Sequence, residues 1–500
     1  MKKPRLIQIL EGLNPGELRR FESFVASPYF NQSETSLKLL RYLMGLHPDY
    51  PGELLAKARL FRAMYGSGPP FKAQAVHDQM SQLLRLLEQF FSQEHFRQDE
   101  TEQKLHLLGE LSHRRLGDHF GRQWRQVEQE QEEAPHRNST YFLQRYRSYV
   151  YADTVAGQHQ TRQIKGRLPE AVQNLDTYYL ATRLRLSCEM VNRRNLVNAE
   201  YETQFIDQVL QMLSVPGNPY QQVPVIAIYY HIYLTLTEKE ADQHYHTLVN
   251  LLSQHDHLFP PDEAYSMYAY AQNYCIRKIN QGETSFLQEI LQLYQRLLEN
   301  GLLLDQGLLA HEHYKNITTV GLRTRAYTWV RDFLEKYRHK LHPDIRENAY
   351  TYNLAAYFYE QQRYRDAMRL LNHVTFTDVF YHLSAKSILL KIYFESEDYD
   401  SLKYHQQAFA AFLKRNKQLP RYHIQTHSNL LRLVKKAGRL RQRLQQPEPN
   451  RASLQQGLTD IEQDIEQAEG VANLSWLRQK LAQLQQDIQA LPLGTEKPEA

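Results

Sequence analysis

Paired histidines are the most conspicuous chemical resource of this sequence, which contains 22 histidines. The close pairs are His244/His246, His255/His257, His311/His313 and His423/His427. Two metal ligands on one helix must share a face, and only the last pair, at i and i+4, meets that condition directly. No carboxylate or cysteine in the local sequence completes a coordination set. We therefore expect packing roles and no metal or cofactor, and a metal-dependent enzyme using paired histidines stays an alternative.

A second candidate is the basic run KKAGRLRQR at 435–443, which could bind phosphate groups. Its cations are Lys435, Lys436, Arg439, Arg441 and Arg443. The next helical pattern carries Asp460, Asp464 and further acidic residues, so pairing within the chain or a solvated helix end is favoured. Proteins that bind single strands favour aromatic residues among the basic ones, and this run contains none. A nucleic-acid-associated factor using this segment is the main alternative function.

Other catalytic signatures are missing from the sequence. It contains neither GxxxxGK[ST] nor GxGxxG, and GSGPP at 66–70 has prolines where helix-opening amides would be needed. There is no GxSxG elbow, and local sequence marks neither Cys188 nor Cys275 as a nucleophile. The two cysteines match no metal pair and no disulfide framework, which favours a reducing, cytoplasmic location. We expect no enzyme activity.

Length and composition indicate an elongated or multidomain helical protein. A chain of 500 residues exceeds the size at which one compact core keeps growing. Only 20 Gly and 20 Pro leave little room for the tight turns of a β-rich fold. The 60 basic and 56 acidic residues nearly balance, so charge alone does not call for nucleic acid.

Two apolar stretches raise the question of a membrane or a leader. The window VPVIAIYYHIYLTL at 223–236 falls short of the roughly 20 residues that a membrane span needs. The start, MKKPRLIQILEGL, breaks its apolar run at Gln8 and Glu11 before reaching the length of a signal-peptide core. We expect a buried helix at the first stretch, no membrane association and no secretion.

Helix start and stop signals recur along the N-terminal part of the chain. Asn14-Pro15-Gly16-Glu17 predicts a helix start with a capping box, and SPYFN at 27–31 ends that helix. Two long helical patterns follow, over residues 71 to about 98 and 99–134. The rhythm then shifts to shorter helices, which suggests a soft boundary near residue 135 and an N-terminal helical domain over 1–135.

Later breakers divide the chain into helix pairs. The spacing predicts pairs over 261–300, 306–341, 344–374 and 377–416, followed by a single helix over 419–437. Periods of about 35 to 45 residues are typical of stacked helical hairpins.

The stretch NLAAYFYEQQRYRDAMRLL at 353–371 is the clearest unit of this series. Ala355 and Ala367 occupy the small positions where two helices cross, and residues 361–363 form a turn. The large packing positions are Phe358, Tyr364 and Leu371. This pattern resembles a tetratricopeptide repeat, and LLKIYFESEDYDSL and NYCIRKINQGETSFLQEIL are degenerate copies of it. The resemblance implies a tetratricopeptide-like α-solenoid over 136–440, whose unit lacks the family's closing proline. The SPYFN element and the repeat order are also similar to a group of long helical proteins of Bacteroidota, which supports the fold alone.

The C-terminal segment has a different pattern. Leu454, Leu458, Ile461 and Ile465 step by 4, 3 and 4, and a second heptad series runs from Leu474 to Leu491. The phase breaks at residues 470–473, which favours a helical hairpin over 451–491 folding back on itself or on the last repeat; an intermolecular coiled coil remains an alternative. We expect a disordered tail at 492–500.

These elements predict an all-α fold: an irregular α-solenoid of stacked helical hairpins with a C-terminal helical hairpin. The resemblance implies that the inner helices turn one set of residues toward a concave face: Tyr352, Ala356, Tyr359, Glu360, Ser387, Lys391, Phe394 and Glu395. Aromatic residues flanked by charges suit an extended or helical peptide, although the same tyrosines could pack against neighbouring repeats. The leading hypothesis is a non-catalytic scaffold that binds a protein or peptide.

Overall fold

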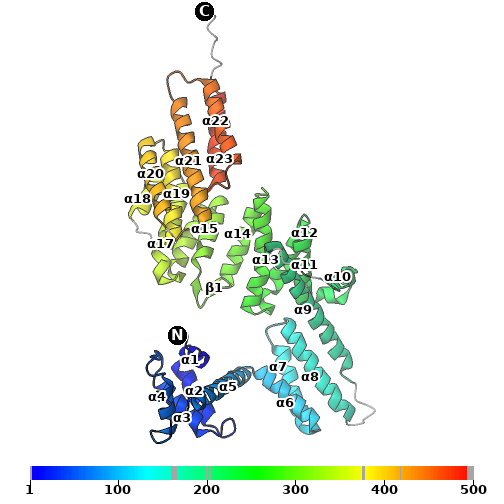
Figure 1. Cartoon of the computed structure of the whole chain (residues 1–500). Coiled ribbons are helices and arrows are strands. Elements are labelled where there is room, and N and C mark those ends of the chain that lie inside the picture. The colour runs from blue at the N-terminus through cyan, green and yellow to red at the C-terminus, as the bar shows by residue number, and fades with distance from the viewer. Residues whose placement is uncertain are drawn as a thin grey trace, which may run out of the picture. The chain divides into compact units, whose positions relative to one another are not determined.

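The chain is all-α, as predicted. The computed structural model describes residues 3–158, 166–197, 201, 204–373, 378–416 and 418–491. This part of the chain forms 23 α-helices and one two-stranded hairpin, and most helices pack on their neighbours in sequence (Figure 1). The chain divides into two compact units, Met1–Ala227 and Ile228–Ala500.

The first unit consists of ten helices, and an eleventh, α11 (Pro224–Thr237), contains the boundary. The ten are α1 (Arg5–Glu11), α2 (Pro15–Ala26), α3 (Glu34–Met44), α4 (Lys57–Tyr65), α5 (Ala73–Gln98), α6 (Glu100–His113), α7 (Gly117–Glu133), α8 (Ser139–Gln158), α9 (Leu168–Val197) and α10 (Ile206–Ser214). A core of leucines, isoleucines and phenylalanines joins α1 to α5. The predicted boundary near residue 135 falls inside this unit, because α8 packs on both α6 and α7.

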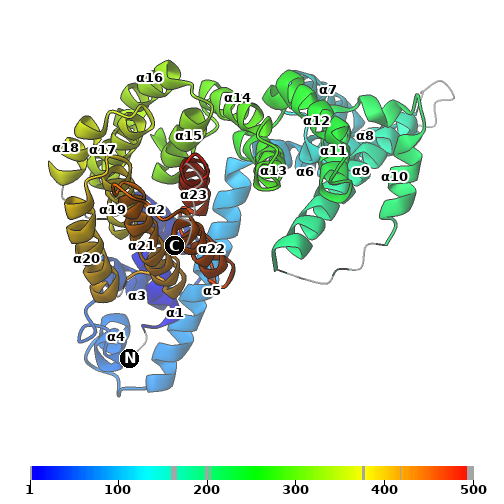
Figure 2. The same cartoon turned by 90° about the horizontal axis from the view of Figure 1, so that it is seen from above.

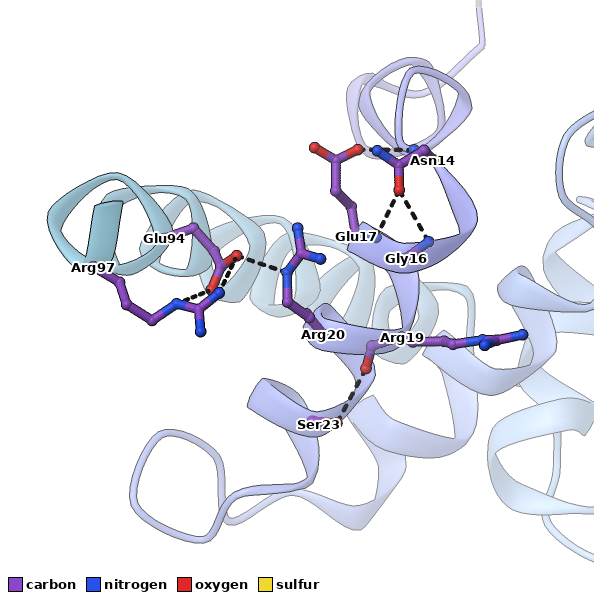
Figure 3. A network of polar contacts seen from close by, with 8 residues as sticks. All are labelled: Asn14, Gly16, Glu17, Arg19, Arg20, Ser23, Glu94 and Arg97. Carbon is purple, nitrogen blue, oxygen red and sulfur yellow. Dashed lines mark hydrogen bonds and ion pairs between the residues drawn. The ribbon is translucent and has the colours of Figure 1, made fainter. Parts of the chain in front are cut away.

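The predicted capping box opens α2. The Asn14 side-chain oxygen accepts hydrogen bonds from the backbone N–H groups of Gly16 and Glu17 at 2.9 and 3.0 Å. The Glu17 carboxylate in turn accepts one from the Asn14 N–H at 2.8 Å (Figure 3). These bonds satisfy N–H groups that a helix start leaves without a partner inside the helix.

The prediction of one long helical pattern over 99–134 is wrong. The chain turns between α6 and α7, where Arg115 takes a left-handed backbone conformation with φ 57°. The turn lets Leu105 and Leu108 of α6 pack with Phe120 and Val127 of α7. Burying these side chains against each other stabilises the hairpin over a single helix that would leave both apolar faces exposed.

The second unit is a stack of helix pairs that ends in a hairpin. Its elements after α11 are α12 (Asp242–His255), α13 (Pro261–Asn280), α14 (Phe286–Glu299), β1 (Leu304–Asp305), β2 (Leu308–Leu309), α15 (His311–Arg323), α16 (Tyr327–Tyr337), α17 (Pro343–Glu360), α18 (Tyr364–His373), α19 (Val379–Glu395), α20 (Tyr399–Arg415), α21 (Arg421–Leu444), α22 (Arg451–Glu466) and α23 (Leu474–Gln489). Short 3₁₀ helices lie at Pro219–Gln222, Asp256–Leu258 and Arg338–Lys340. The pairs α13/α14, α15/α16, α17/α18 and α19/α20 fall within the predicted ranges to a few residues.

The inner helices of this stack lie side by side. Helix α17 packs on both α15 and α19. Figure 2 shows α16, α18 and α20 on the outer side of this row and α23 on its inner side. The predicted turn at 361–363 joins α17 to α18, and Ala355 and Ala367 are fully buried. Small residues at these positions let the two helices approach closely.

The C-terminal hairpin is confirmed and packs on the last repeats. Its heptad residues on α22 and α23 join one core with apolar residues of α19, α20 and α21. Leu477, Leu481, Leu484 and Ile488 are almost completely buried there. The hairpin is therefore part of the second unit. The predicted disordered tail, residues 492–500, lies outside the described residues.

Candidate functional site

Three successive inner helices share one cavity of about 340 Å³, which we call the inner cavity. Six of the eight predicted groove residues line it: Tyr352, Ala356, Tyr359, Glu360, Ser387 and Lys391. Helix α15 adds Lys315, Thr319 and Arg323, and the C-terminal part adds His427 and Asn473. The α15 residues were not predicted from the sequence, although their spacing of four residues is that of one helix face.

Cations without ion pairs are the main electrostatic feature of the inner cavity. In the part of the chain that the structure describes, Lys315, Arg323 and Lys391 form no ion pair. The Lys315 ammonium donates to the Ser384 hydroxyl at 3.3 Å and lies over the Tyr352 ring, 5.3 Å from its centroid. Burial lowers the pKa of both lysines and outweighs the attraction of Glu360 and Glu395 for Lys391 and of Asp378 for Lys315. The arrangement holds cationic donors in a partly desolvated place where an anionic group would be attracted strongly.

Aromatic rings form the other wall of this site. The Lys391 ammonium lies 5.5 Å from the ring centroid of Tyr359 and 5.8 Å from that of Trp476. Cation–π attraction of this kind orients a lysine without neutralising its charge. The lysine head is therefore positioned and still able to bind an anion.

The two remaining predicted groove residues do not line the inner cavity. Phe394 is 1% exposed and packs edge-on against Trp476 of α23, with ring centroids 5.6 Å apart. The Glu395 carboxylate accepts hydrogen bonds from the Trp476 indole N–H at 2.6 Å and from the Tyr359 hydroxyl at 2.8 Å. This placement corrects the groove prediction, because helix α23 covers the end of α19 that carries both residues.

Glu395 is the centre of a buried polar network. The Tyr364 hydroxyl donates to it at 2.5 Å, and the Lys480 ammonium lies 3.3 Å away. Burial opposes ionisation of this carboxyl, but the hydrogen bonds from Trp476, Tyr364 and Tyr359 outweigh it and lower the pKa of Glu395. The network ties α17, α18 and α19 to α23.

The basic run splits into two sets. Lys436 pairs with Asp464 at 2.5 Å, Arg441 pairs with Glu397 at 2.6 Å, and Arg443 donates to the Ser453 hydroxyl at 2.5 Å. The first of these is the internal pairing that the acidic residues of the next helix suggested. The other two cations of the run, Lys435 and Arg439, line a different groove, between α20 and α21.

The histidine pairs lie among ordinary packing and hydrogen-bonding partners. His427 Nδ1 lies 2.8 Å from the carbonyl oxygen of His423, one helical turn earlier. His244 Nε2 lies 3.1 Å from Glu238, and His313 Nε2 lies 3.2 Å from the Tyr265 hydroxyl. Within the described ranges, no three His, Cys, Asp or Glu side chains gather as metal ligands would.

Both cysteines are buried thiols. Burial raises the pKa of Cys275 to about 12 and raises that of Cys188 well above its ordinary value. The Cys275 thiol donates to the Tyr245 hydroxyl at 3.2 Å. Since the thiolate is the nucleophile, neither side chain is prepared for nucleophilic attack.

No helix in the described part of the chain is long and apolar enough to cross a bilayer. Comparisons with protein-family models, with curated proteins and with solved structures found no match to this chain, a long all-helical protein whose helices pack in sequential pairs.

Proposed function

We propose that the protein is a non-catalytic helical scaffold that binds a partner protein or peptide at the inner cavity. The observation that carries this proposal is the convergence of Lys315, Arg323 and Lys391 on one cavity without ion pairs to the rest of the described chain. The partner chemistry that fits is an acidic side chain or a carboxylate on a peptide, with tyrosine rings as the apolar walls.

The energetics of the lysines support a binding role over a structural one. Taking a charged group out of water without an ion-pair partner costs free energy, and a residue with only a packing role would be apolar or paired. Lys480, which forms an ion pair with Glu395 at 3.3 Å, shows how the same region pairs a lysine for structure. Two lysines that form no ion pair in one cavity are expected of a site that binds an anion.

The repeat architecture supports the same proposal. We infer a tetratricopeptide-like solenoid over α13 to α20, because Ala355 and Ala367 are buried and the turn at 361–363 lies where the repeat requires it. Solenoids of helical pairs present extended inner surfaces that suit peptide partners. The two buried thiols agree with the proposed cytoplasmic location.

A peptide selection tests this function. The full-length protein is panned against a random displayed peptide library, and a selected peptide is synthesised with a fluorescent label. We expect enrichment of Asp and Glu, and binding by anisotropy that weakens at least about tenfold, or 1.4 kcal/mol, in the double variant K315M/K391M.

The control is K403M/K435M, which removes the same charge outside the inner cavity. We expect its affinity to stay within about twofold of the wild type, a change of under 0.5 kcal/mol. Equal loss in both double variants, or selection of no peptide, would contradict the proposed function.

A further inference from the structure

A second groove lies between α20 and α21, with a volume of about 680 Å³, and we call it the outer groove. Helix α20 contributes Tyr399, Lys403 and Gln406 to its lining at one-turn spacing. Helix α21 contributes Arg432, Lys435 and Arg439 at the same spacing. Figure 2 shows the two helices side by side. With a rise of 1.5 Å per residue, the α21 row spans roughly 10 Å.

Positive charge in the outer groove is poorly neutralised. Among the described residues, Lys403, Lys435 and Arg439 form no ion pair, and Arg432 shares Asp464 with Lys436 at 3.1 Å. Asp400 is the only acidic residue that lines the groove in the described part. The groove therefore attracts anions along its length.

Two buried polar atoms in the outer groove also lack partners. The Tyr399 hydroxyl and the Gln406 side-chain nitrogen are shielded from solvent and make no hydrogen bond within the described residues. Buried polar groups are normally hydrogen-bonded, and an exception needs an explanation. Both atoms can donate, as can the nearby lysines and arginines. These donors favour a ligand that is rich in acceptor oxygens.

The lining of the outer groove favours a nucleic acid over a peptide as its ligand. Its two large apolar lining residues, Leu402 and Leu431, are buried and present little side-chain surface to the aromatic or aliphatic anchor that peptide binding relies on. A row of cations one helical turn apart matches a backbone with regularly spaced charges.

We propose that the outer groove binds the phosphate backbone of single-stranded nucleic acid, without reading its sequence. Lys403, Lys435 and Arg439 contact the phosphates. This site is separate from the inner cavity and does not depend on the function proposed for that cavity.

The basic run itself provides a matched pair of variants. K435M/R439M removes one lysine and one arginine that line the outer groove, whereas K436M/R443M removes one of each from the same helix at positions bonded to α22. Both double variants change net charge equally. K403Q, on the opposite wall, tests the groove independently of any effect on α21.

The experiment titrates the full-length protein into a fluorescein-labelled oligo(dT) of about 20 nucleotides at about 50 mM salt and follows anisotropy. We expect K435M/R439M to bind at least about tenfold more weakly, with its slope of log K against log salt reduced by about 1.4. K403Q should weaken binding in the same direction, and K315M/K391M should leave it unchanged.

Three results would overturn the proposal, with circular dichroism confirming the fold of each variant. The first is an equal loss in K436M/R443M and K435M/R439M, which would make net charge the cause. The second is no saturable binding by the wild type at this low salt. The third is competition by oligo-glutamate as effective as that by unlabelled oligo(dT), which would make the groove a general anion site.

Discussion

Lys480 and Lys391 show how one residue type serves two roles, since the first forms an ion pair in the described chain and the second forms none. Lys480 lies 3.3 Å from the Glu395 carboxylate and is 17% exposed. Lys391 lies between tyrosine and tryptophan rings, and burial lowers its pKa. A lysine whose pKa falls on folding destabilises the folded state while it is charged, and the penalty disappears as pH rises past its unfolded value.

We therefore predict opposite effects of two equivalent substitutions. K391M should raise the free energy of unfolding at about pH 7 by about 1 kcal/mol, because it removes a poorly neutralised charge. K480M should lower it by about 1 to 2 kcal/mol, because it leaves Glu395 without its cation. Urea denaturation followed by circular dichroism measures both. Destabilisation by K391M would show that this lysine has a structural role.

Glu395 should make stability depend on acidity. Its pKa is lowered from an ordinary value of 4.5, so its ionised form stabilises the fold at neutral pH and that contribution is lost as pH falls below 4.5. E395Q should cost about 2 kcal/mol at neutral pH, and the difference from wild type should shrink on acidification.

The matched control is E397Q, because Glu397 is 41% exposed in its pair with Arg441. This substitution should cost less than about 1 kcal/mol at neutral pH. A gap between E395Q and wild type that is the same in acid and at neutral pH would contradict the role given to the ionised carboxylate.

At the scale of elements, α23 is a fixed part of the second unit. Its apolar residues are almost completely buried against α19 and α21, and undocking the helix would expose all of them. Each such side chain is worth roughly 1.5 to 3 kcal/mol, so the hairpin does not act as a removable lid.

Substitution at the α23 interface tests this conclusion. L477A should lower the free energy of unfolding by about 2 to 5 kcal/mol, since Leu477 is completely buried. Q485A, on the exposed face of the same helix, should change it by less than about 0.5 kcal/mol. Equal small effects in thermal or urea unfolding would mean that α23 does not pack as described.

The start of α2 offers a second test. N14A removes the side chain that caps the N–H groups of Gly16 and Glu17 and should destabilise the first unit by about 1 kcal/mol. R19A, on the same helix, removes an exposed side chain and should have little effect. Unfolding of the two variants compared with wild type gives the result, and no loss in N14A would refute the cap's contribution.

Helix pairs were predictable because the residues that start and end their helices are local sequence signals. Capping residues, prolines at helix starts and turn residues placed α13 to α20 within a few residues of their observed limits. The single helix predicted over 419–437 is α21, which continues to Leu444. The turn between α6 and α7 was missed because no proline marks it. Arg115 adopts its left-handed conformation there because packing of the two helices stabilises it.

At the scale of the whole molecule, the site was only partly predictable. The repeat register placed the α17 residues and two from α19 on one face, and these residues do line the inner cavity. The α15 cations were missed because no copy of the repeat signature covers that helix. Phe394 and Glu395 were misplaced because the sequence does not reveal where a C-terminal hairpin docks.

The most direct test of the central claim is hydrogen–deuterium exchange of the full-length protein with and without a selected acidic peptide. The inner cavity should show slower exchange in α15, α17 and α19 when the peptide is bound, and K315M/K391M should abolish that protection. Protection confined to other helices at saturating peptide, or protection that persists in the double variant, would contradict the proposed binding site.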